Sequence, residues 1–174
     1  MANGLANGAR ERTENRTFEL VGGHPALDLV NTLDWRFRDS GPEELMTDYR
    51  DMVRFAEQSG LVGNAQARRL IRNTSESKAA QVVAAVRELR EAAAQVLYAS
   101  LDGDDAPASG VAQLESYFKS AQKAQRLHQA GARLAWELPQ SASLPELPLC
   151  LLSLSAAELM TSDEMERVRA CGNL

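Results

Sequence analysis

The sequence predicts a mostly α (α+β) domain, with about six or seven helices packed around a long central helix and one small antiparallel β-hairpin. Three observations support this fold. Apolar residues recur at helical steps of three and four over most of the chain. The longest such run, at positions 76–101, is expected to form the central helix. The pattern then changes to alternation at Leu134, Trp136 and Leu138, which is typical of a strand.

Composition is typical of a soluble globular domain. The 174 residues are 44% hydrophobic and 25% charged, which is enough for one domain with a real core. The net charge of −5 argues against a surface that binds nucleic acid by itself, because such domains usually carry a basic patch. Two cysteines, Cys150 and Cys171, do not make a disulfide framework. No apolar run approaches the length of a membrane span, so we expect no membrane partner.

The first 17 residues lack the apolar core of a signal peptide. They are dominated by Asn, Gly, Arg, Glu and Ala, so we expect a disordered leader over 1–17. The protein is accordingly expected to be cytoplasmic, with its folded domain beginning at Phe18.

The first half of the chain is expected to form three helices. Pro25 suits the first turn of a helix, and Gly22-Gly23 before it lets the chain turn sharply into that helix. Thr47 is the expected N-cap of a second helix that stops before Gly60. The expected elements are helices over 25–36, 47–59 and 64–71, with a turn over 39–42.

The second half is expected to hold the central helix, three further helices and the hairpin. The apolar stripe of 76–101 holds more Ala and Val than Leu or Ile, which favours a bundle helix over a coiled coil. Gly131 indicates a turn back to a partner strand over 126–129. The sequence Thr161-Ser162-Asp163-Glu164 has the spacing of a capping box. The expected elements are helices over 76–101, 111–124, 149–160 and 161–170, a loop over 102–110, the hairpin, and an irregular stretch over 141–148.

A second stripe lies on the first predicted helix. His24, Asp28, Asn31 and Trp35 step by four, three and four residues, so they share a face beside the apolar stripe. For His24 and Asp28 the alternatives are a His–carboxylate pair for metal binding or proton transfer, or two groups satisfied locally at the helix start. Arg90 lies at the edge of the apolar stripe of the long helix, so we expect it to be partly buried and to need a partner. We predict that Asp28 pairs with Arg90 and that Asn31 bonds nearby.

This predicted network has two interpretations. One is a fixed structural link that holds two helices in register. The other is a pocket for a small polar ligand, lined by Asp28, Asn31, Trp35, Arg90 and Trp136. Trp136 suits a cavity wall because indole has a large apolar body and one N–H donor, although packing of the hairpin onto the helices also explains it. Cys150 is expected to be a small buried hydrophobe, since nothing adjacent supplies the positive charge that a redox thiolate needs.

Four segments, in chain order, carry a resemblance to a known family. They are VGGHPALDLVNTLDW at 21–35, TDYRDMVRFAEQSGLV at 47–62, RELREA at 87–92 and SAAELMTSDEMERVRAC at 155–171. Together they resemble the bacterial CGNR zinc-finger proteins, whose N-terminal portion is called the ABATE domain. The first and last segments are the most specific. The resemblance covers nearly the whole chain from Phe18 onward, so it implies an ABATE-like helical domain over 18–170.

The resemblance also implies a function and a zinc site. The family is described as putative stress-induced transcription regulators, with the N-terminal domain regarded as a sensor or interaction module. A compact zinc ribbon, thought to contact DNA, follows this domain in the family. Cys171 matches the first zinc ligand, so 171–174 resembles the stub of that ribbon. Because a structural zinc site needs about four Cys or His ligands, we expect zinc only with the ribbon, and no cofactor or specific DNA binding for this chain alone.

We therefore expect a regulatory ligand-sensing or interaction domain of a transcription regulator, in which changed helix packing passes through the last helix to the ribbon after Cys171. The expected ligand is a small organic molecule entering between the first helix, the long helix and the hairpin. One alternative is a homodimerisation module without ligand, marked by an exposed apolar patch on the 111–124 helix or the last helix. Another is an uncharacterised enzyme, marked by a cleft that holds His24, Asp28 and His128. Known catalytic motifs are absent, so we expect no catalytic residues.

Overall fold

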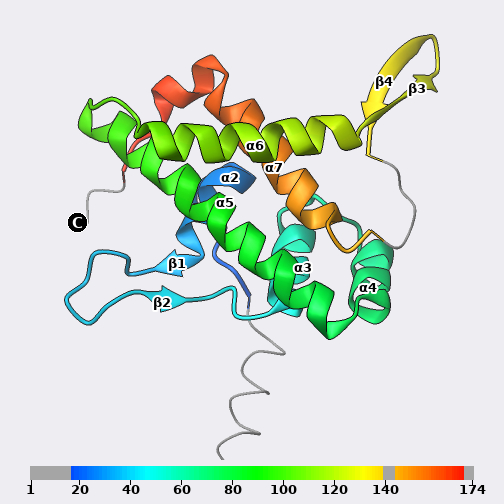
Figure 1. Ribbon diagram of the computed structural model, residues 1–174, viewed down its shortest axis with the longest axis horizontal. Coiled ribbons are helices and arrows are strands. Elements are labelled where there is room, and N and C mark those ends of the chain that lie inside the picture. Colours follow the sequence, from blue (N-terminus) through cyan, green and yellow to red (C-terminus); the bar gives the residue numbers. More distant parts are fainter. Residues whose placement is uncertain (1–16, 139–143, 171–174) are drawn as a thin grey trace, which may run out of the picture.

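The structure is a computed structural model that describes residues 17–138 and 144–170 (Figure 1). These residues form six α-helices, one 3₁₀-helix and two antiparallel two-stranded sheets: α2 (Pro25–Asn31), β1 (Leu33–Asp34), β2 (Glu43–Glu44), α3 (Tyr49–Gln58), α4 (Asn64–Asn73), α5 (Glu76–Asp102), α6 (Ala108–Ala124), β3 (Arg126–Ala130), β4 (Arg133–Glu137), α7 (Leu147–Met160) and η1 (Asp163–Arg167). The predicted fold class is confirmed, with the β1–β2 sheet as an addition. The predicted leader, apart from Thr17, and the predicted stub at 171–174 lie outside the described residues.

The long helix α5 is the axis of the structure, as predicted. Ser75 caps its start, because the side chain accepts a hydrogen bond from the backbone N–H of Lys78 at 3.4 Å. Gly103 ends it at a φ of 76°, a left-handed conformation that glycine adopts readily. Four helices pack against α5, namely α2, α3, α6 and α7. It is therefore the central helix of a bundle.

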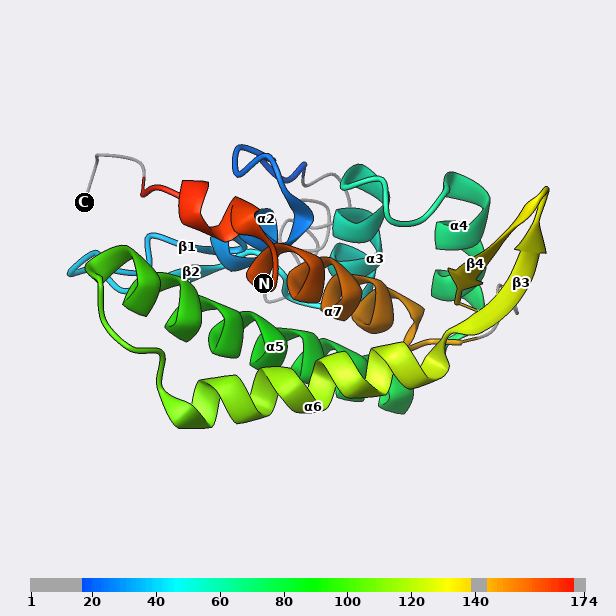
Figure 2. The same cartoon turned by 90° about the horizontal axis from the view of Figure 1, so that it is seen from above.

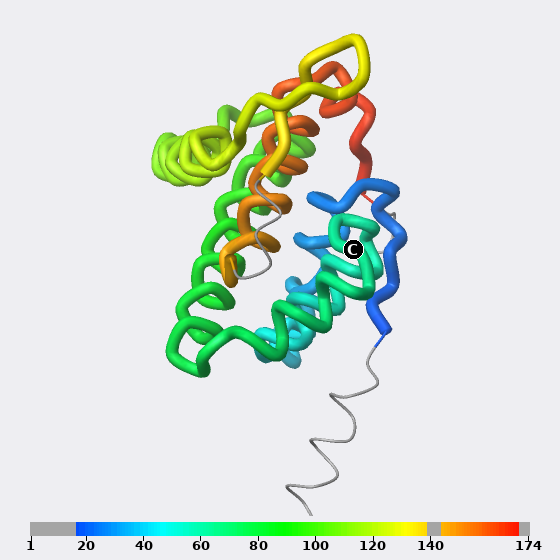
Figure 3. Tube along the Cα trace, turned by 90° about the vertical axis from the view of Figure 1, so that its right-hand side faces the viewer, coloured from blue at the N-terminus to red at the C-terminus, as the bar shows by residue number. Residues whose placement is uncertain are grey.

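The other helices form two groups along α5. In the first, α6 and α7 pack against each other and against α5, while α2 contacts both α5 and α7 (Figure 2). In the second, α3 and α4 pack together, and α3 also contacts α5 and α7 (Figure 3). The short helix η1 packs against α7.

One main hydrophobic core joins the two groups. Its largest fully buried apolar side chains are Leu29, Met46, Met52, Phe55, Leu89 and Leu152. Phe18 packs edge-on against Phe55 with ring centroids 5.3 Å apart, so the segment before α2 is held to α3. A smaller cluster of Ala26, Ala156 and Leu159 joins α2 to α7.

The first helix is shorter than predicted. It ends at Asn31 rather than at position 36, because Thr32 caps it and donates from Oγ1 to the carbonyl of Leu29 at 2.6 Å. The chain then enters the β1–β2 sheet, where Leu33 pairs with Glu44. Strands of two residues are too short to show alternation, so the sequence indicated only the turn that joins them.

The last predicted helix is also different. Instead of an α-helix over 161–170, the chain forms the short 3₁₀-helix η1. Ser162 caps it by accepting a hydrogen bond from the backbone N–H of Glu164 at 3.3 Å. Thr161 belongs to the end of α7, since its Oγ1 donates to the carbonyl of Ala157 at 2.7 Å. The capping signal is therefore real but displaced by one residue.

Other boundaries shift slightly. Asp48 rather than Thr47 caps α3, because its side chain accepts a hydrogen bond from the backbone N–H of Asp51 at 3.0 Å. Helix α7 begins two residues earlier than predicted, which places Pro148 in its first turn. The β3–β4 hairpin forms as predicted, with Gly131 in its turn at a φ of 65°.

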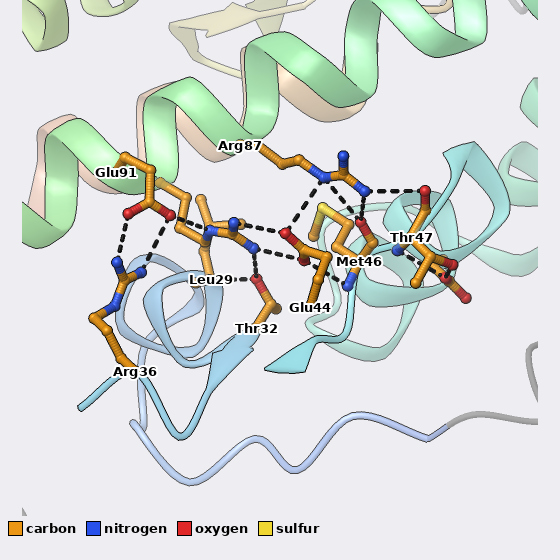
Figure 4. A network of polar contacts seen from close by, with 10 residues as sticks. Leu29, Thr32, Arg36, Glu44, Met46, Thr47, Arg87 and Glu91 are labelled. Atoms are coloured by element: carbon orange, nitrogen blue, oxygen red, sulfur yellow. Dashed lines mark hydrogen bonds and ion pairs between the residues drawn. The ribbon is translucent and has the colours of Figure 1, made fainter. Parts of the chain in front are cut away.

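Arg90 is a buried cation at the contact between α5 and the β1–β2 sheet. Figure 4 shows its partners Thr32, Glu44 and Glu91 within the same network of polar contacts. Its Nη1 and Nη2 donate to the two carboxylate oxygens of Glu44, each at 2.8 Å. Its Nε donates to Glu91 at 2.9 Å, and Nη1 also reaches the hydroxyl of Thr32 at 3.2 Å. Burial alone would lower the pKa of Arg90, but the hydrogen bonds and charges of Glu44 and Glu91 raise it, so the guanidinium stays charged.

Two further arginines extend this network in opposite directions. Arg36 forms a bidentate ion pair with Glu91, which ties the loop after β1 to α5. Arg87 donates to the backbone carbonyls of Met46 at 2.7 Å and Thr47 at 3.0 Å, which ties the segment before α3 to α5. The chain between α2 and α3 is thus fastened to α5 by three arginine side chains.

Replacing Arg90 should destabilise the fold. In Arg90→Leu, Glu44 loses its bidentate partner, and we expect the free energy of unfolding to fall by about 2–3 kcal/mol. Arg90→Lys should recover only part of this loss, because an ammonium group cannot donate as a planar fork. Urea denaturation measures the difference. Arg68→Leu, at an exposed position on α4, is the control and should change the value by less than about 0.5 kcal/mol. Equal losses in the two leucine variants would contradict this role of Arg90.

The pH dependence of Glu91 offers a second test. Burial alone would raise the pKa of Glu91, but hydrogen bonds and charges from Arg36 and Arg90 hold it below its ordinary value. Such a carboxylate stabilises the fold above its unfolded pKa and loses that effect as the pH falls through the folded pKa. Glu91→Gln should therefore cost about 1 kcal/mol near pH 7. The cost should shrink below the ordinary glutamate pKa of about 4.3. Urea denaturation near pH 7 and below this pKa measures the loss of stability in Glu91→Gln, and Glu158→Gln, at an exposed position, is the control. A loss of stability that grows as the pH falls would contradict the prediction.

Candidate functional site

An open groove of about 1340 Å³ lies beside α2. Its walls come from segment 17–24, α2, β1 and the loop after it, the last turns of α5, and segment 164–170. Apolar, aromatic and charged side chains mix along this lining, which suits an organic molecule with both polar and apolar parts. The volume exceeds that of most small-molecule pockets, so a small ligand would fill only part of the groove.

His24 sets the start of α2 on one wall of the groove. It is the N-cap residue, with an extended backbone, and its Nδ1 accepts a hydrogen bond from the backbone N–H of Ala26 at 3.2 Å. Pro25 follows in the first turn. The local interpretation of His24 is therefore confirmed, because its ring serves the helix start.

Asp28 is buried, with 5% of its surface exposed. Its Oδ1 accepts a hydrogen bond from the backbone N–H of Gly22 at 2.7 Å, so it fixes the loop that leads into the helix. That loop passes so close that a Cβ on Gly22 would lie 2.7 Å from the Cβ of Leu27. Burial raises the pKa of Asp28, while the Gly22 hydrogen bond and nearby His24 act in the opposite direction.

The predicted pair between Asp28 and Arg90 does not form. Arg90 directs its hydrogen bonds to Glu44, Glu91 and Thr32, whereas Asp28 binds the Gly22 backbone. The physical reason is β2, which brings a different carboxylate to the guanidinium. Of the two interpretations of Arg90, the structural link therefore describes its observed contacts, with a partner that the sequence did not indicate.

Trp35 lies in the groove lining but not on α2. The helix has already ended, so the predicted stripe is broken before Trp35. Its backbone has a φ of 50°, a left-handed conformation that is unusual for a bulky residue, and Asp34 Oδ1 accepts its N–H at 2.8 Å. Arg38 stacks over the indole at 3.9 Å from the ring centroid. This half-exposed ring is a strained, positioned group of the kind found at functional sites.

Several lining residues were missed by sequence reasoning. Phe37 packs edge-on against Tyr98 of α5 with ring centroids 5.1 Å apart, and both line the groove. Glu164, Arg167 and Val168 from the C-terminal segment form another part of the lining. The closely spaced aromatic and basic residues at 35–38 were a readable signal, but only the fold shows that they line the same groove as segment 164–170.

Only some of the predicted ligand-binding residues line the groove. Asp28, Asn31 and Trp35 line the groove, with Asn31 exposed on α2. Arg90 and Trp136 do not line it. Trp136 is 65% exposed on β4, so the expected packing of the hairpin onto the helices is wrong for this side chain. Alternation identified the strand correctly but could not reveal that its apolar face is uncovered.

The cleft expected for an enzyme is not assembled. His128 lies on β3, where its Nδ1 is 3.5 Å from an oxygen of Glu137, and it does not line the groove that holds His24 and Asp28. Burial raises the pKa of the Cys150 thiol and Glu146 raises it further, as expected for a packing residue rather than a reactive thiolate. In the part of the chain that the structure describes, no three His, Cys, Asp or Glu side chains are grouped so that they could hold a metal ion.

Comparison with protein families identifies the class of this domain. Residues 23–163 match the family model ABATE, described as a putative stress-induced transcription regulator. Because the match spans well over half of the sequence, the chain belongs to the ABATE family, whose description is that of a putative transcription regulator and not of an enzyme. Comparisons with curated proteins and with solved structures gave no match.

None of the helices within the described ranges has the length and hydropathy that a membrane crossing requires. Cys171 lies outside both the matched and the described residues.

The buried carboxyl group of Asp28 predicts a pH effect opposite to that of Glu91. A group whose pKa is raised in the folded state contributes stability below its unfolded pKa of about 3.9, and loses it as the pH rises through the folded pKa. Asp28→Asn retains an oxygen for the Gly22 N–H and cannot ionise. Relative to the unmodified chain, it should therefore gain stability between about pH 4 and pH 7.

Urea denaturation at the two pH values measures this difference. Glu19→Gln, an exposed position on the same groove, is the control. If the stability of Asp28→Asn relative to the unmodified chain is the same at both pH values, burial does not raise the pKa of Asp28 in the folded protein.

Proposed function

We propose that this ABATE domain senses a small organic molecule in the groove beside α2 and passes the signal through segment 163–170 to the zinc ribbon that the family resemblance implies. One observation carries the proposal: Asp28 and Asn31 of α2 line the same groove as Glu164, Arg167 and Val168. A ligand seated in the part of the groove between α2 and residues 164–168 would touch both the domain and the segment that leads toward Cys171.

The lining favours a ligand with a flat apolar part and an anionic or polar group. Trp35, Phe37 and Tyr98 offer aromatic surface, and Arg38 places a cation over one face of the indole. The exposed amide of Asn31 adds a donor and an acceptor. Because Asp28 is already engaged with Gly22, its role in the proposal is to shape the wall rather than to contact the ligand.

Segment 163–170 is suited to transmission because it is weakly held. The helix η1 is short, and Met165 and Val168 are the half-buried apolar side chains that pack it against the core. Ligand contacts to this segment would favour one of its positions by the difference in affinity between the two states. The zinc, the DNA contact and any DNA specificity then belong to the ribbon. In this proposal the domain itself needs no cofactor or catalytic group and acts in the cytoplasm.

Ligand screening tests the proposal. Thermal denaturation of the full chain against a library of small metabolites should reveal compounds that raise the melting temperature, because a ligand selective for the folded state stabilises it. For such a compound, Trp35→Ala and Asn31→Ala should each weaken binding by about tenfold, measured by calorimetry. Trp136→Ala is the matched control, since it removes an exposed tryptophan outside the groove, and should leave binding unchanged.

Hydrogen exchange tests the transmission step. Amides of segment 163–170 should exchange more slowly when the compound is bound, because its position is then restricted. Binding that survives Trp35→Ala would place the ligand elsewhere. Binding in the groove without slower exchange in this segment would remove the proposed route of the signal.

A further inference from the structure

The β3–β4 hairpin extends away from the helices beyond the end of α6 (Figures 1 and 2). One of its faces carries three large apolar side chains, with Leu127 49% exposed, Leu134 58% and Trp136 65%. They share a face because alternate residues of a strand do, and because Leu127 pairs with Trp136 across the hairpin. None of the described helices makes an extensive contact with either strand. A lone two-stranded hairpin is marginal in water, so this one lacks the cover that such hairpins need.

The sequence of β4 is complementary to itself. It reads Arg-Leu-Ala-Trp-Glu from Arg133 to Glu137. If two such strands pair antiparallel about Ala135, Arg133 lies opposite the second copy's Glu137, and Leu134 lies opposite the second copy's Trp136. Opposite charges and aromatic–aliphatic pairs stabilise neighbouring strands. The two-fold symmetry forms each pair twice.

The directions of the backbone N–H and C=O groups along β4 agree with this pairing. In an antiparallel ladder, residues that hydrogen bond to one neighbour alternate with residues whose N–H and C=O point away. The two-residue turn makes Ala130 and Arg133 the closing pair, which leaves the backbone groups of Leu134 and Trp136 on the outer edge. These are the two residues that would face each other in the symmetric pairing.

Strand β3 does not offer the same match. Antiparallel pairing of two β3 strands about His128 would place two histidines opposite each other. It would also place Arg126 opposite Ala130, with no opposite charge available. The outer edge of β4 is therefore the edge that fits a second copy of this chain.

We propose that the free edge of β4 is a homodimer interface, in which two copies pair antiparallel about Ala135 to form one four-stranded sheet. Glu137 then lies between Arg126 of its own hairpin, its partner in the register, and Arg133 of the second copy. The apolar side chains of the two hairpins form one continuous strip and shield one another at the centre of the sheet. This interface is independent of ligand binding in the groove.

Disulfide crosslinking tests the register directly. In the full chain carrying Cys150→Ala and Cys171→Ser, the variant Ala135→Cys should crosslink into a dimer under mild oxidation. Directly opposed residues of this kind have Cα atoms about 4.5 Å apart, within the reach of a disulfide. His128→Cys is the matched control, because it pairs with Ala135 in the hairpin. In the proposed dimer, position 128 of one copy and position 128 of the other lie three strand spacings apart, about 14 Å, so no crosslink is expected.

Charge reversal tests the same pairing without cysteine chemistry. Arg133→Glu places like charges opposite each other at both pairs, and should raise the dimer dissociation constant by about tenfold in sedimentation measurements. Glu137→Arg should have a similar effect. Mixing the two variants restores opposite charges at both pairs, so the mixture should associate as tightly as the unmodified chain.

Three outcomes would contradict the proposed interface. One is an unmodified chain that stays monomeric at the highest concentrations that sedimentation allows. A dimer that crosslinks as fast at position 128 as at position 135 would place the contact elsewhere on the hairpin. A dimer that neither single charge variant weakens would exclude this register. Because Ala135→Cys leaves every charge in place, its result stands even where Glu137→Arg loosens the hairpin itself.

Discussion

The buried guanidinium of Arg90 is the constraint on which the groove-bearing half of the structure depends. A cation that has left water must be neutralised with good geometry, and Glu44 meets this need with two parallel hydrogen bonds. Glu44 can reach Arg90 only if the chain between α2 and α3 runs back along α5. That path requires α2 to stop at Asn31 and creates the β1–β2 sheet.

The loop between β1 and β2 is held by a single face of α5. Glu91 and Tyr98 are seven residues apart, which is about two helical turns, so they project from similar positions on that helix. The first binds Arg36 and the second packs against Phe37. With the flanking residues fastened in this way, the chain tolerates the left-handed backbone of Trp35 and presents its ring to the groove.

Features that depend on neighbouring residues could be predicted from the sequence, whereas pairings between distant segments could not. The length of α5, the hairpin turn at Gly131 and the helix start at Pro25 each depend on neighbouring residues, and all were predicted. The burial of Arg90 was also foreseen, but its carboxylate comes from a strand 46 residues away that has no periodic signal of its own. Trp136 shows the same limit, since alternation identifies the two faces of a strand but not which one is covered.

The two proposals together constrain the geometry of the regulator. The groove touches the last turns of α5, and the hairpin begins only after α6 has run back along that helix. With its 17 residues, α6 separates these points by about 25 Å. A dimer joined through β4 would therefore carry its two grooves, and the segments leading toward Cys171, at its outer ends. Two DNA-contacting ribbons attached there would be separated by about 50 Å or more, which is longer than one turn of DNA at about 34 Å. In such a regulator the hairpin fixes the distance between the two halves of the DNA site, while the groove controls how each ribbon is presented to its own half.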